Sequence, residues 1–170
     1  MNWLDQIGNI LESYTGSAGG AATAPSAVRE HFDQIAQVAP KSEMAEGLAE
    51  AFRSDQTPSF DQMVSNLFSH SDGEQRAGIL NRLLAVAGPG ILAQLPMLAG
   101  SLTGGQQITP QQAEKVPPET VQQMASQAEQ KRPSIVDEVS GFYAEHPQVV
   151  KALGGAALAI LIQKMANRER

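Results

Sequence analysis

Three histidines are the side chains best suited to acid–base or metal chemistry near neutral pH. His31, His70 and His146 lie far apart in the sequence, at predicted helix ends or on polar helix faces. A shared metal site would need the fold to bring them together. We therefore expect capping or solvent-facing roles for these histidines and predict no metal site.

A row of glutamates is the second candidate for metal chemistry. Glu43, Glu46 and Glu50 fall on one face of a predicted helix, and carboxylate oxygens are ligands that divalent cations prefer. A bound cation would need further oxygens from another helix. Because Glu43 and Glu46 also suit the positive end of the helix dipole, we expect the row to be solvated.

The sequence matches none of the common catalytic patterns. It contains no G-x-S-x-G, no Gly-Lys pair for a phosphate loop, no H-E-x-x-H and no G-x-G-x-x-G. The E-x-x-H motif of di-iron helix bundles is absent, and so is cysteine, which excludes disulfides and a cysteine nucleophile. We therefore predict a protein that is not an enzyme and that holds no cofactor.

The net charge of −6 is distributed unevenly along the chain. Residues 1–82 hold five Lys or Arg against eleven Asp or Glu, whereas residues 83–170 hold seven of each kind. Neither half has the basic stripe that binding to phosphates requires. We therefore expect no nucleic-acid partner.

The first 15 residues predict an amphipathic helix, because its large apolar side chains recur at helical spacing within an arc of about 120°. These side chains form the candidate interaction face: Trp3, Leu4, Ile7, Ile10, Leu11 and Tyr14. On such a stripe, aromatic residues usually lie in a core or at an interface. Residues 16–26 contain Gly, Ala and Ser without charge, which is typical of a flexible linker. We expect a tethered helix that can dock or swing free.

The N-terminus does not resemble a secretory signal. It has no basic region before its apolar residues, carries Asp5 early and is amphipathic instead of solidly apolar. We therefore expect a cytoplasmic or cytosol-facing protein.

Residues 27–170 predict an all-α fold, a compact bundle of roughly eight to ten short helices with a hinge near 103–108. No run of apolar residues alternates as a strand would. Several helix starts carry capping patterns, in which a side chain bonds the free amides of the first turn. These starts are Ser42, Ser59 with Gln62, Asp72 with Gln75, Thr109 with Gln112, and Ser134 with Asp137.

Two apolar segments could lie in a core or contact lipid. Residues 83–113 carry no charge but include prolines, and the final helix is apolar on every face from Ala152 to Ile162. That stretch spans about 16 Å, too little for a hydrocarbon layer of about 30 Å. We therefore expect a core helix, with close packing at Gly155 and Ala159. The residues expected to be buried are Leu153, Ala156, Ile160 and Leu161.

Three stretches resemble a group of uncharacterised bacterial helical proteins. They are MNWLDQIGNIL, AFRSDQTPSFDQMVSNLF, and the long run from ITPQQAEKVPPETVQQ to HPQVVKALGGAALAI. The opening helix and the Gly-rich break also resemble the YidB-like family, whereas the long final helix departs from it. The resemblance implies a bacterial origin and a helical fold, and it implies no catalytic activity.

These observations favour a non-enzymatic interaction protein, an adaptor or scaffold, that binds a protein partner or itself. The tethered helix and the 83–113 region would supply its contact surfaces. The alternative is a peripheral membrane-associated protein that uses its first and last helices. Against that alternative, the first helix carries Asp5 and Glu12 and no Lys or Arg.

Overall fold

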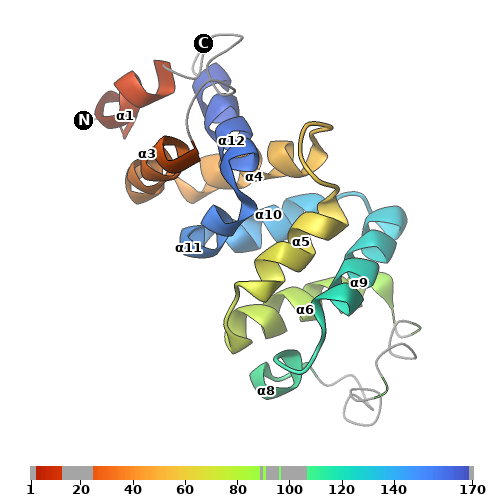
Figure 1. Ribbon diagram of the computed structural model, residues 1–170. Helices are drawn as coiled ribbons and strands as arrows, with labels where there is room; N and C mark the ends of the chain where they lie inside the picture. The colour runs from red at the N-terminus through yellow and green to blue at the C-terminus, as the bar shows by residue number, and fades with distance from the viewer. Residues whose placement is uncertain (1–2, 13–24, 89, 91–95, 97–106, 169–170) are drawn as a thin grey trace. The chain divides into compact units, whose positions relative to one another are not determined.

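A computed structural model describes residues 3–12, 25–88, 90, 96 and 107–168 (Figure 1). In this part of the chain the protein has ten α-helices, one short 3-10 helix and no strand. The all-α fold that the helical spacing predicted is therefore confirmed.

The chain divides into two compact units. The helical domain over 27–170 that the sequence predicted stays a prediction. Unit 1 comprises Met1–Ser59 and Ser140–Arg170, and unit 2 comprises Phe60–Val139. The second boundary falls inside a helix, α10 (Ile135–Ala144), where neither proline nor a polar linker marks it. Most of the expected hinge at 103–108 lies outside the described residues.

Unit 1 is built around its last helix. α12 (Gly155–Arg168) packs along α4 (Lys41–Arg53) and α3 (Pro25–Val38), and α1 (Trp3–Glu12) packs against α3 and α12 (Figure 1). The buried side chains of these helices are aliphatic or aromatic and recur at helical spacing, as an internal core requires. They include Val28, Phe32, Ile35, Met44, Leu48, Phe52, Leu158, Leu161, Ile162 and Met165.

Two helices of unit 1 approach closely at a glycine of α4. A Cβ atom built on Gly47 would lie 2.9 Å from the carbonyl oxygen of Leu161 and 3.0 Å from its Cγ. Real Cβ atoms scarcely ever approach other atoms that closely. The absent side chain of Gly47 therefore allows α4 and α12 to pack closely. Close packing at Gly155 and Ala159 stays a prediction.

The final apolar segment is broken, which corrects the expectation of one continuous helix. α11 (Pro147–Val150) and the 3-10 helix η2 (Lys151–Leu153) end at Gly154, whose φ of +92° favours glycine. No single helix among the described residues is long and apolar enough to cross a membrane. The pair Pro147–Leu153 and Gly155–Asn167 meets that requirement together, with a bend of 119° between its parts.

The buried face of α12 also differs from the predicted one. Leu161 is buried as expected, but Ala156 is exposed, and Leu153 and Ile160 are only half-buried. The break at Gly154 separates Leu153 from α12. The prediction assumed one continuous helix through Leu153, and it therefore assigned some of the wrong residues to the buried face.

Unit 2 is built around one helix, α9 (Pro118–Lys131), that packs on two others. It packs along α5 (Phe60–Ser69) and α6 (Gly73–Ala87), and α8 (Pro110–Ala113) packs on α6 (Figure 1). α6 turns one apolar face inward, with Ala77, Ile79, Leu80, Leu83 and Ala87 buried. The buried side chains of unit 2 include Phe60, Met63, Leu67, Phe68, Ile79, Leu80, Leu83, Val121 and Met124.

The predicted capping box at Asp72 and the predicted cap at Thr109 are confirmed in unit 2, and both are capping boxes. The Gln75 backbone N–H donates to Asp72 Oδ1 at 2.8 Å, and the Asp72 N–H donates to Gln75 Oε1 at 3.1 Å. Thr109 and Gln112 repeat this exchange at 3.2 and 3.0 Å. Each box stabilises a helix start by bonding free amides of the first turn.

Two helix starts differ from the predicted ones. α4 begins at Lys41, and Pro40 occupies its N-cap without a side-chain hydrogen bond, so Ser42 lies inside the first turn. α3 begins at Pro25, within the expected linker. Proline is compatible with a first helical turn because the N–H that it lacks has no helical acceptor there.

A side-chain amide holds the segment that precedes α8. Asn81 Oδ1 accepts from the Ile108 backbone N–H at 2.8 Å, and Asn81 Nδ2 donates to the Ile108 carbonyl at 3.3 Å. Ile108 is buried and lies outside any helix. One carboxamide thus bonds both polar groups of a single non-helical residue, an arrangement that we call the amide clasp.

Candidate functional site

The apolar face of α1 is only partly described. Ile7 is buried and Ile10 is half-buried in unit 1, where α1 packs on α3 and α12. Ile7 therefore helps to dock the helix on its own chain. The other members of the predicted face have side chains outside the described residues: Trp3, Leu4, Leu11 and Tyr14.

The structure distributes the histidines over both units. His31 is half-buried on α3, and His146 is the N-cap of α11, with its ring 5.0 Å from that of Phe142. His70 is exposed just after α5, where its Nδ1 lies 2.9 Å from the Asn66 carbonyl oxygen. Over the residues that the structure describes, no three His, Asp or Glu side chains are placed to hold a metal ion.

The glutamate row lies on α4 in unit 1. Glu46 and Glu50 are exposed and Glu43 is half-buried. Lys164 of α12 lies 3.7 Å from a Glu50 oxygen, so α12 presents an ammonium to this row where a cation site would need more oxygens. An exposed pair of this kind contributes at most about 1 kcal/mol.

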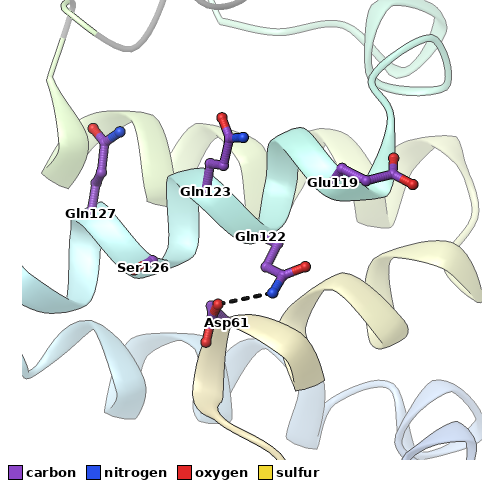
Figure 2. Close-up of a pocket in the computed structure, with 6 residues that line it drawn as sticks. All are labelled: Asp61, Glu119, Gln122, Gln123, Ser126 and Gln127. Atoms are coloured by element: carbon purple, nitrogen blue, oxygen red, sulfur yellow. Dashed lines mark hydrogen bonds between the residues drawn. The ribbon is translucent and has the colours of Figure 1, made fainter.

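A polar concavity of about 530 Å³ opens along α9 in unit 2 (Figure 2). Five of its lining residues come from α9, and the sixth comes from α5. They are Asp61, Glu119, Gln122, Gln123, Ser126 and Gln127. We call this feature the α9 groove.

Helical spacing explains why these side chains share one surface. Glu119, Gln123 and Gln127 are four residues apart, and so are Gln122 and Ser126, which places them in two adjacent rows. In Figure 2, Gln123 and Gln127 stand in a row along α9 and point the same way. The opposite side of α9 is buried, because Val121, Met124, Ala125 and Ala128 pack into unit 2.

Two hydrogen bonds fix α9 against α5. Ser65 Oγ donates to the carbonyl of Pro118, the first residue of α9, at 2.9 Å. Gln122 Nε2 donates to Asp61 Oδ2 at 3.1 Å and joins the two helices inside the groove (Figure 2). The two helices that line the groove are therefore joined by hydrogen bonds as well as by apolar packing.

The chemistry of the groove suits binding. A glutamine carboxamide donates two hydrogen bonds and accepts two, and it does not titrate in the physiological range. The lining holds two carboxylates and no cation, so it presents acceptor oxygens with negative charge. Such side chains can bind hydrogen-bond donors and the backbone N–H and C=O groups of a peptide.

The groove was not predicted from the sequence. The four-residue spacing of Glu119, Gln123 and Gln127 was visible, yet solvated polar faces show the same pattern. The sequence did not reveal that α5 lies beside α9 and supplies Asp61. That pairing depends on tertiary contacts between residues about 60 apart.

No family model, curated protein or solved structure matches this chain. The resemblance to bacterial helical proteins and to the YidB-like family remains a prediction.

Proposed function

We propose that this chain is a non-enzymatic helical interaction protein, an adaptor or scaffold that binds a protein partner or a second copy of itself. The observation that supports this proposal is the lining of the α9 groove. Its glutamines and serine supply directional hydrogen bonds on a surface that packing holds rigid. We further propose a cytoplasmic location. The acidic net charge of −6 supports the proposal that nucleic acid is not a partner.

The amphipathic α1 supplies a second contact surface in this proposal. Its exposed Asp5, Gln6 and Asn9 face solvent while Ile7 is buried on unit 1. The uncharged Gly, Ala and Ser residues that precede α3 predict a flexible tether, so we propose that α1 exchanges with an undocked state.

The test is a cross-linked pull-down from the native host, combined with sedimentation of the purified chain. The full chain should capture a defined partner or self-associate, and removal of residues 1–15 or the double change Gln123→Ala and Gln127→Ala should weaken that association. A monomer that captures nothing specific in repeated experiments would overturn the proposal.

The second candidate is peripheral association with a membrane. The observation that favours it is the bent apolar pair Pro147–Leu153 and Gly155–Asn167. The burial of Leu158, Leu161 and Ile162 within the fold favours the first proposal instead. Flotation of the purified chain with liposomes, abolished by deleting residues 148–170, would support the membrane candidate.

A further inference from the structure

We propose that the α9 groove binds an extended peptide segment that carries a basic residue, with Gln123 and Gln127 bonding its backbone. This inference rests on the proposed interaction function and specifies the class of partner. It follows from the spacing of the groove's side chains, their hydrogen-bonding capacity and their charge.

The spacing fits an extended chain. Positions four apart on a helix are separated by about 6 Å along its axis. Alternate residues of an extended chain are about 6.6 Å apart and point their polar backbone groups the same way. Glu119, Gln123 and Gln127 therefore stay within about 1 Å of register with a peptide over its first five residues, which flexible glutamine side chains accommodate.

The hydrogen-bonding capacity distinguishes an extended segment from a helical one. The backbone N–H and C=O groups inside a helix are already bonded to each other, whereas those of an extended segment are open. The Asn81 clasp shows the required geometry within this chain, since one carboxamide bonds the N–H and C=O of the non-helical Ile108 at 2.8 and 3.3 Å. Gln123 and Gln127 have the same functional group.

The charge of the groove selects the side chain that the peptide carries. Asp61 and Glu119 are the charged residues of the lining, and both are acidic. Asp61 accepts a hydrogen bond from Gln122, which holds its carboxylate in place, and Glu119 is exposed. A lysine or arginine near Glu119 would gain electrostatic attraction there, whereas a glutamate would be repelled.

The probes are three fluorescein-labelled synthetic octapeptides. The first alternates Ser and Lys, the second replaces each Lys by Glu, and the third repeats the first with N-methylated backbone amides. Fluorescence anisotropy should show saturable binding of the first, with the second and third weaker by at least 10-fold. Added salt should weaken binding of the first peptide, because salt screens the attraction between exposed charges.

Variants of the full chain locate the site. Gln123→Ala and Gln127→Ala should each weaken binding by roughly 2- to 10-fold, the worth of one or two net hydrogen bonds. Glu119→Gln should reduce the preference for Lys over Glu. The control is Gln130→Ala, which changes an exposed glutamine of the same helix outside the groove lining and should leave affinity unchanged.

Circular dichroism of each variant should show unchanged stability, since alanine is a good helix former. Equal binding of all three peptides, no binding of any, or equal effects of Gln123→Ala and Gln130→Ala would overturn the peptide proposal. A partner captured by the full chain and retained by the groove variants would also overturn it, while the broader interaction function would stand.

Discussion

Side-chain amides bond backbone groups at several positions of unit 2. Gln75 and Gln112 do so within capping boxes, and Asn81 does so across 27 residues of sequence. The bonds between Asn81 and Ile108 are partly buried, and a buried polar group without a partner costs about 1–3 kcal/mol. The amide clasp therefore links the segment before α8 to α6.

We expect Asn81→Ala to loosen that segment. The substitution removes the acceptor of the Ile108 N–H and the donor to its carbonyl, so the loss should be about 1–3 kcal/mol. Amide hydrogen exchange at Ile108 is the direct measurement, and its protection should fall. Gln130→Ala serves as the control. Unchanged exchange at Ile108 would show that the clasp contributes nothing.

The close approach at Gly47 predicts an unusual response to alanine. Gly47→Ala should destabilise unit 1, because overpacking against Leu161 costs about 1–3 kcal/mol and outweighs a helix-propensity gain of about 1 kcal/mol. Gly141→Ala is the matched control, since a Cβ there meets no atom within 4 Å. In urea unfolding, the free energy of unfolding should therefore be higher for Gly141→Ala than for the parent chain, and lower for Gly47→Ala. The reverse order would contradict the packing argument.

At the scale of elements, the capped helix starts at Asp72 and Thr109 were more predictable than the inward face of α12. The boxes at Asp72 and Thr109 are local, because four consecutive residues contain both partners of each exchange. The break at Gly154 was less visible, since two adjacent glycines in an apolar run are also compatible with a continuous helix that packs closely. Because the break was not predicted, some residues were wrongly assigned to the buried face of α12.

The corrected face predicts which α12 substitution costs more. Leu158 is fully buried and Ile160 is half-buried, so Leu158→Ala should lower the free energy of unfolding by about 2–5 kcal/mol and Ile160→Ala by clearly less. Thermal or urea unfolding measures both. An Ile160→Ala loss equal to that of Leu158→Ala would restore the face predicted from sequence.

At the scale of the whole chain, composition and periodicity predicted the all-α class, but not the division into units. Both ends of the chain contribute to unit 1, and only contacts between distant residues reveal that α12 packs with α3 and α4. The α9 groove was hidden for the same reason, because Asp61 and Gln122 meet only after α5 and α9 pair. Local patterns carry no information on such pairings.

Removal of residues 1–15 tests how firmly α1 belongs to unit 1. The remaining chain should stay folded, with a melting temperature lowered by less than about 10 °C, because the Gly, Ala and Ser residues that follow the first helix predict that few of its contacts are obligatory. Ile7→Asp in the full chain should lower the melting temperature by the same amount if this side chain is the main docking contact.

Unit 2 provides the internal control for the truncation. Ile108 belongs to unit 2, so its amide exchange should not change when α1 is removed. A larger fall in melting temperature would mean that several kcal/mol of stability come from α1, which would make it part of the core and leave its apolar face unavailable to a partner. Loss of protection at Ile108 would instead show that the two units unfold together.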